Sequence, residues 1–200
     1  MDLKNINLRD PYILPHNGRY YMYGSRGFES NGFDVYISDD LENWSEPSSV
    51  FEYYDGFWAD KEFWAPEVYE WGEKFVMFAS FKSNERARGT QVLIADSPMG
   101  PFKEHSSGAI TPKEWECLDG TLYIENGEPY MVFCHEWVQI KNGTVCSIKL
   151  SNDLKEAVSK PQILWRAKDA DCFKNTNESE GYITDGPFMI KIDDELLCFW

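Results

Sequence analysis

The sequence has 200 residues, enough for one large domain, and carries 19 Lys and Arg against 34 Asp and Glu, a formal charge of −15. This charge argues against a nucleic-acid backbone or an anionic membrane surface as partner, because both need a positive footprint. Trp, Tyr and Phe together make up 16% of the chain. That proportion suits a β-rich fold and a surface that binds rings.

The N-terminal segment lacks the long apolar stretch of a secretory signal, and no apolar run is long enough to span a membrane. The five cysteines show no Cys-x-x-Cys spacing, which favours small buried side chains over a metal or redox site. We therefore expect a cytoplasmic protein with reduced cysteines and no metal. The cysteines are Cys117, Cys134, Cys146, Cys172 and Cys198.

Four segments of the chain repeat one layout, in which a leading residue stands eight positions before a turn residue and an apolar run follows the turn. Two of the turns are Asn-Gly pairs, at residues 17–18 and 126–127, and this pair between apolar runs is a strong hairpin signal. The leading residues are Asp10, Trp64, Asp119 and Asp185.

After each of the first three hairpins, a third apolar run, a turn and a more polar fourth run complete a unit of about fifty residues. Four short antiparallel strands per unit predict an all-β fold, a β-propeller with blades near 8–52, 62–112, 117–166 and, in part, 182–200. A meander sandwich is the alternative, and the equal spacing argues against it. We expect one incomplete domain of about three and a third blades, truncated at its C-terminus, that self-associates through an open strand edge.

The first strand of each propeller blade lines the central axis, so the leading residues should converge at one end of it. Three carboxylates so close cannot all ionise freely, and at least one pKa should be raised toward the working pH. A proton-donating acid and a separate base are what glycoside hydrolysis requires. Aromatic walls would suit a sugar ring.

The stretches around these residues resemble the family 43 glycoside hydrolases: Arg9-Asp-Pro-Tyr-Ile, Trp64-Ala-Pro-Glu-Val, Asp119-Gly-Thr-Leu-Tyr and Thr184-Asp-Gly-Pro-Phe. The resemblance implies a five-bladed propeller that hydrolyses arabinose-, xylose- or galactose-containing polysaccharides with inversion. By position, it makes Asp10 the general base, Asp119 the residue that adjusts the pKa of the acid, and Asp185 the general acid.

One departure from the family lies at Asp185, where the family usually has a Glu in a Glu-x-Pro pattern. Asp is one methylene shorter, and a positioning error near 1 Å can cost about a hundredfold in rate. Glu180 and Glu136 are the available substitutes for the acid. Counted along a strand of period two, Glu67 should point away from the site as a buried structural partner.

For substrate binding the sequence offers aromatic and polar residues at strand ends. Members of the family often hold an axial calcium ion near a histidine, a part that His135 could play, but no row of oxygen ligands marks a calcium loop. We therefore predict no metal and no required cofactor. The expected substrate-binding residues are Trp64, Phe81, His135, Glu136 and Trp137.

Two other functions fit the same sequence. The first is an inactive carbohydrate-binding propeller, which the short acid and the missing blades favour. The second is a propeller glycoside phosphorylase, which would need a cluster of basic residues to hold phosphate. Arg86 and Arg88 are the close basic pair near a strand start, although a salt-bridged loop explains them as well.

Overall fold

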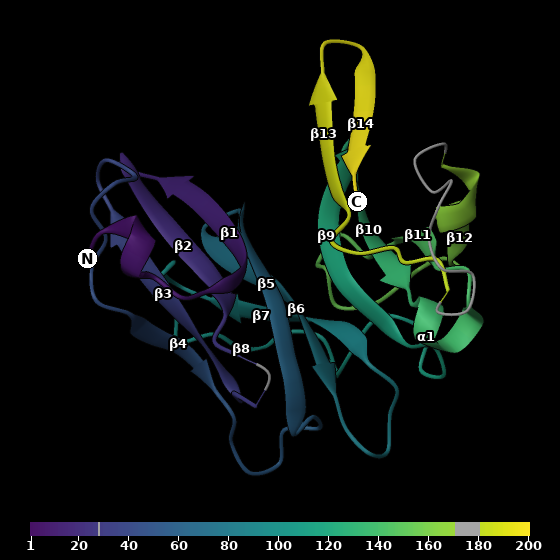
Figure 1. Cartoon of the computed structure of the whole chain (residues 1–200), viewed down its shortest axis with the longest axis horizontal. Helices are drawn as coiled ribbons and strands as arrows, with labels where there is room; N and C mark the ends of the chain where they lie inside the picture. Colours follow the sequence, from purple (N-terminus) through teal and green to yellow (C-terminus); the bar gives the residue numbers. More distant parts are fainter. Residues whose placement is uncertain (28, 171–180) are drawn as a thin grey trace.

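The computed structural model describes residues 1–27, 29–170 and 181–200 and has three four-stranded antiparallel sheets followed by a two-stranded hairpin (Figure 1). Each sheet follows chain order, so its strands form a meander from the first to the fourth. This arrangement confirms the predicted all-β propeller architecture of four-stranded blades.

The strand bounds follow the repeats seen in the sequence. In the first blade they are β1 (Arg9–His16), β2 (Arg19–Ser25), β3 (Gly32–Ser38) and β4 (Ser48–Glu52). In the second blade they are β5 (Lys61–Trp71), β6 (Lys74–Lys82), β7 (Gly89–Ala95) and β8 (Lys103–Glu104). In the third blade they are β9 (Cys117–Glu125), β10 (Glu128–His135), β11 (Thr144–Lys149) and β12 (Gln162–Arg166). The hairpin comprises β13 (Phe188–Ile192) and β14 (Glu195–Phe199).

In the described part of the chain, helix is confined to short pieces outside the sheets. They are the 3₁₀ turns η1 (Leu3–Asn5) and η2 (Ala167–Asp169) and the single helical turn α1 (Trp137–Ile140). Within the described part of the chain, no helix is long and apolar enough to cross a membrane. Cys172 and Glu180 lie outside the described residues.

The blades are held together by apolar side chains that fill the spaces between neighbouring sheets. One buried cluster joins the first and second blades and includes Tyr23, Phe33 and Phe63. Another joins the second and third blades and includes Phe78 and Phe133. A smaller third cluster brings Met189 of the hairpin against the third blade. The second strands of the first three blades are buried along most of their length because they are covered on both faces.

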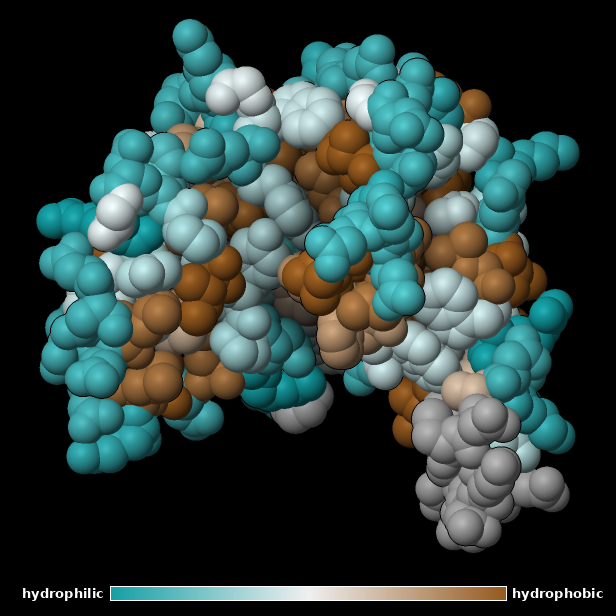
Figure 2. All heavy atoms as spheres, turned by 90° about the horizontal axis from the view of Figure 1, so that it is seen from above, coloured by the Kyte–Doolittle hydropathy of each residue, from teal (hydrophilic) through white to brown (hydrophobic). Residues whose placement is uncertain are grey.

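The surface divides in the same way. On the face shown in Figure 2, hydrophilic side chains occupy much of the periphery, and apolar groups gather between them nearer the centre. Among the exposed apolar residues, Ile13 of β1 and Phe188 of β13 belong to the first strands of their blades. Exposed apolar side chains on the first strands therefore lie near the exposed carboxylate of Asp10.

Candidate active site

In the first three blades the repeated motif lies at an interruption in the pairing of the first strand. In β1 the pairing passes from Arg9 opposite Ser25 directly to Tyr12 opposite Tyr23. In β9 it passes from Leu118 opposite Cys134 to Thr121 opposite Val132. Two residues of each first strand therefore face one residue of the second strand, which is a β-bulge.

The first residue of each bulge adopts a left-handed backbone, with φ of 51° at Asp10 and 53° at Asp119. The same conformation occurs at Ala65 and at Gly186, each with φ of 46°. These four residues stand seven positions before the first residue of the following turn. They are the structurally equivalent positions of the four blades.

This equivalence corrects the sequence count by one residue in two blades. Trp64 and Asp185 each stand one position before the equivalent residue, because counting to Gly72 and to Asp193 reaches the first residue of those turns. Counting to Gly18 and Gly127 reaches the second residue instead. As a result Ala65, and not the indole of Trp64, lines the cavity at this level.

The bulges open into a cavity of about 590 Å³ that contains all three predicted catalytic carboxylates. A fourth carboxyl, from Glu67, joins them. None of the described lining residues is Lys, Arg or His, so no basic side chain of the lining neutralises this acidic group. The lining residues are Asp10, Pro11, Tyr12, Ile13, Ala65, Glu67, Asp119, Asp185, Gly186 and Phe188.

Asp10 is oriented by a hydroxyl group that also binds the next blade. Ser25 Oγ donates to Asp10 Oδ2 at 2.9 Å and accepts from the backbone N–H of Ala65 at 2.8 Å. Arg9 Nη2 lies 3.9 Å from the same carboxylate oxygen. The Asp10 side chain remains 40% exposed. It can therefore hold a water molecule while its direction is fixed.

Asp119 lies deeper and is hydrogen-bonded to Asp185. Its backbone N–H donates to Ser80 Oγ at 2.9 Å, and its Oδ2 accepts from the backbone N–H of Gly186 at 3.2 Å. Burial, together with a hydrogen bond to Asp185 and the charges of Asp185 and Asp10, raises the pKa of Asp119 well above its ordinary value. The Asp119–Asp185 pair therefore retains a proton where a free Asp would have lost it.

Glu67 lines the cavity, so the expectation that it points elsewhere is wrong. The count of period two fails because the β5 pairing skips from Trp64 opposite Ser80 to Glu67 opposite Phe78. The bulge rephases the strand and places Glu67 at the level of Tyr12 and Thr121. Burial raises the pKa of Glu67 to about 7.

Phe81 lies in the apolar core and not on the cavity. It is fully buried in the cluster between the first two blades, where its ring packs edge-on against Phe63 with centroids 5.0 Å apart. Phe57 and Phe33 also pack against it. A side chain without exposed surface has no face to offer a sugar, and the strand-end position of Phe81 gave no sign of this burial.

Trp64 and Glu136 meet at a buried arginine between the second and third blades. The Arg88 guanidinium lies over the Trp64 ring, 4.5 Å from its centroid. Its Nη1 donates to Glu136 Oε2, and its Nε donates to Glu62 Oε2 at 2.6 Å. Burial raises the pKa of Glu136, and the nearby guanidinium opposes that shift. The ion pair gives Glu136 a structural partner beside the acid cavity.

His135 and Trp137 lie at the end of β10, next to this cluster. The buried imidazole of His135 stacks on Trp115, with ring centroids 4.3 Å apart, and its Nε2 bonds Gln139 Oε1 at 2.6 Å. Burial lowers the pKa of His135. Trp137 is half-buried at the start of α1. Neither residue lines the acid cavity, and among the described residues no group of three His, Cys, Asp or Glu is placed to hold a metal.

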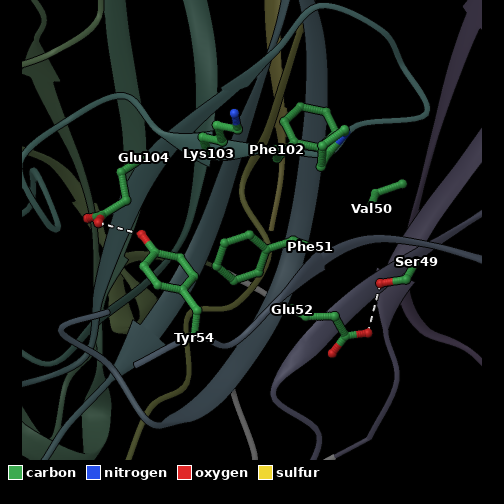
Figure 3. Close-up of a pocket in the computed structure, with 9 residues that line it drawn as sticks. Ser49, Val50, Phe51, Glu52, Tyr54, Phe102, Lys103 and Glu104 are labelled. Atoms are coloured by element: carbon green, nitrogen blue, oxygen red, sulfur yellow. Dashed lines mark hydrogen bonds between the residues drawn. The ribbon is translucent and has the colours of Figure 1, made fainter. Parts of the chain in front are cut away.

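A second cavity, of about 580 Å³, lies between the outer strands β4 and β8 (Figure 3). Its carboxylates are engaged with neighbouring groups. Glu104 accepts from the hydroxyl of Tyr54 at 2.6 Å, and Glu52 pairs with Arg26 at 2.6 Å. Among the described residues, the group of four carboxyls without a basic lining residue therefore lies in the first cavity and not here.

Comparison with known proteins agrees with the fold and with the family that the sequence motifs resemble. Residues 3–200 match the protein family described as "Glycosyl hydrolases family 43". Xylosidase/arabinosidase 43A of Humicola insolens is 26% identical over 155 residues, which cover 68% of this chain and 46% of that protein. Extracellular endo-alpha-(1->5)-L-arabinanase 2 of Bacillus subtilis is 26% identical over 66% of this chain and 30% of its own. The chain thus spans less than half the length of these curated relatives.

Among solved structures, the endo-arabinase of Bacteroides thetaiotaomicron superposes with a TM-score of 0.90 at 36% identity. The match covers 97% of this chain and 69% of that one. The likeness therefore extends over nearly the whole of this chain.

Proposed function

Because the chain belongs to glycosyl hydrolases family 43, we propose that it hydrolyses O-glycosidic bonds of arabinose-, xylose- or galactose-containing saccharides with inversion of the anomeric centre. The observation that carries the proposal is the cavity in which an exposed, oriented Asp10 faces the proton-holding pair of Asp119 and Asp185. One carboxylate is available as a base, and a second carboxyl retains a proton as an acid.

In the proposed reaction, Asp10 removes a proton from a water molecule as the water oxygen attacks the anomeric carbon. The bond between that carbon and the leaving oxygen breaks, and Asp185 supplies the proton that the leaving oxygen takes up. Asp119, whose pKa is raised by burial and by Asp185, holds a proton that it can return to Asp185 through their shared hydrogen bond. Attack and departure occur on opposite faces of the sugar, so the configuration inverts.

The substrate that we propose first is an α-1,5-linked arabinan. The Bacteroides thetaiotaomicron endo-arabinase is 36% identical to this chain, and the Bacillus subtilis relative is also an arabinanase. Xylosides are the next choice, because the Humicola insolens relative is a xylosidase/arabinosidase. Pocket shape and a few hydroxyl contacts decide between such sugars.

A catalytically inactive sugar-binding protein is the second candidate, and the position of Asp185 favours it. Asp185 precedes the equivalent position by one residue, is exposed, and carries a shorter side chain than the Glu usual in the family. A proton donor displaced by about 1 Å can lose about a hundredfold in rate.

A phosphorylase is disfavoured by charge. The described lining of the cavity holds four carboxyl groups and no basic side chain. Arg86 donates to the carbonyl oxygens of Ala109 and Thr111, and Arg88 is paired with two glutamates. Arg9 lies 3.9 Å from Asp10, but the four carboxyl groups give the cavity a negative potential that disfavours phosphate.

The test is release of reducing ends from α-1,5-arabinan, xylan and galactan by the wild type and by Asp10→Asn. We expect turnover on at least one polymer and a loss of at least about a hundredfold in Asp10→Asn. Asp39→Asn, the same change at an exposed aspartate outside the cavity, should retain wild-type turnover. Sugar binding without turnover by the wild type would favour the inactive binding protein instead.

A further inference from the structure

Glu67 occupies a level of the cavity that the hydrolytic roles of the three aspartates do not use. It is the residue at which β5 resumes pairing after its bulge, as Tyr12 does in β1 and Thr121 in β9. These three positions form a second level, two residues along the first strands from Asp10, Ala65 and Asp119. Both levels line the same cavity on the β1 and β5 sides.

Hydrogen bonds from two blades fix the carboxyl of Glu67. The Tyr69 hydroxyl donates to Glu67 Oε2, and it bonds Thr121 Oγ1 at 2.9 Å. The same hydroxyl oxygen accepts from the backbone N–H of Leu122 at 3.3 Å. The Tyr12 ring packs against Tyr69, with centroids 5.4 Å apart. The carboxyl is thus held in one direction at the cavity wall.

The groups facing Glu67 offer it no neutralising cation. Burial raises the pKa of both Tyr12 and Tyr69, so each stays a neutral phenol. Burial likewise raises the pKa of Glu67, to about 7, while the bonds from Tyr69 and Thr121 act against the shift. The titratable groups that line the cavity with Glu67 or bond it are Asp10, Tyr12, Tyr69, Asp119 and Asp185. The nearby cation on β1 is Arg9, which lies 3.9 Å from Asp10.

We propose that Glu67 is a sugar-contacting residue that binds in its neutral form, as a hydrogen-bond donor from the cavity wall to a ring hydroxyl. A protonated carboxyl group has an O–H that can donate a hydrogen bond, whereas an ionised carboxylate can only accept one. A sugar that fills the cavity also displaces the water that would solvate an ionised Glu67, so binding favours the neutral carboxyl.

This inference rests on the proposed function only in taking the ligand to be a sugar. The experiment is calorimetric titration of arabinotriose into full-length protein carrying Asp10→Asn, which blocks hydrolysis, at about pH 6 and about pH 8. We expect about tenfold weaker binding at the higher pH, because most of Glu67 is then ionised. In the same background, the side chain of Glu67→Gln stays neutral and keeps a hydrogen-bond donor. The affinity of this variant for arabinotriose should therefore differ by less than about twofold between the two pH values.

Glu73→Gln, the same substitution at an exposed position in the turn of the same blade, should show the pH dependence of the parent. Equal pH dependence with and without Glu67→Gln would overturn the assignment of Glu67, and so would failure of the parent to bind the sugar at both pH values. If arabinotriose binds with the expected pH dependence but the wild type does not turn over, the contact is supported and the hydrolase proposal fails.

Discussion

At the scale of single residues, Arg88 and Glu67 are two charged residue types with little exposure to solvent. Arg88 is 8% exposed in its side chain and lies between Glu62 and Glu136, over the face of Trp64. Glu67 is a carboxyl held at the cavity wall by Tyr69. The charge of Arg88 is neutralised by two glutamates, whereas burial of Glu67 favours its protonated, neutral form.

Replacing Arg88 by Met should lower the free energy of unfolding by about 3–5 kcal/mol, because Glu62 and Glu136 would lose their buried partner. Urea denaturation measures the change. Arg19→Met serves as the control, since the Arg19–Asp39 pair is exposed and should contribute less than about 1 kcal/mol. A loss at Arg88 as small as that at Arg19 would contradict the structural role.

The raised pKa of Glu67 also makes a prediction about stability. Folding favours the protonated carboxyl, so the stability associated with it is present below the ordinary pKa of 4.5 and is lost as the pH rises toward about 7. Glu67→Gln should therefore flatten the pH dependence of the unfolding free energy across this range. Denaturation series at several pH values test this, and a parallel slope in both proteins would contradict it.

At the scale of elements, serine hydroxyls connect one blade to the bulge of the next. Ser25 Oγ receives the N–H of Ala65, and Ser80 Oγ receives that of Asp119. Each serine belongs to the end of a second strand and binds the first strand of the following blade. The backbone turn that presents the cavity residues is thereby fixed between sheets, rather than within one.

Ser25→Ala should reduce stability by about 1–3 kcal/mol, because a backbone donor loses its partner, and it should also lower kcat/KM by releasing Asp10. Ser38→Ala offers a matched comparison. The buried Ser38 hydroxyl accepts a hydrogen bond from the backbone N–H of Leu41 at 2.8 Å, and Ser38 does not line the cavity. This substitution should cost similar stability with unchanged kcat/KM. Equal kinetic effects of the two substitutions would count against the orienting role of Ser25.

The sequence predicts the blade repeat well because hairpin turns and apolar runs are local signals. The bulges are not local in this sense: they appear only when a strand is paired with its neighbour. For this reason a count along the sequence misses the equivalent position by one residue at Trp64 and Asp185, and it points Glu67 away from the cavity that Glu67 lines. The burial of Phe81 depends on aromatic rings from both of the first two blades, and no count along one strand reveals it.

At the scale of the whole molecule, aromatic packing between blades positions the cavity. Phe81 contacts Phe33, Phe57 and Phe63 in the space between the first two sheets. Asp10 and Glu67 come from the first strands of those two sheets. The geometry of the acid site therefore depends on a core that contributes no side chain to it.

Phe81→Ala should lower the free energy of unfolding by about 3–5 kcal/mol, as expected for a fully buried ring. Phe81→Leu, which leaves a smaller void, should cost less and retain the substrate KM, since Phe81 contacts no sugar. Thermal unfolding and steady-state kinetics of the two variants check this. A large rise in KM for Phe81→Leu with an unchanged melting temperature would show that the ring contacts substrate after all.

The most direct test of the central claim, an inverting hydrolase built on Asp10, Asp119 and Asp185, is proton NMR of arabinotriose hydrolysis in its first minutes. The account predicts that the newly formed reducing sugar appears first as the β-anomer, inverted from the α-linkage, and then mutarotates. First appearance of the α-anomer would contradict inversion, and the absence of any hydrolysis by the wild type would contradict the catalytic role of the cavity.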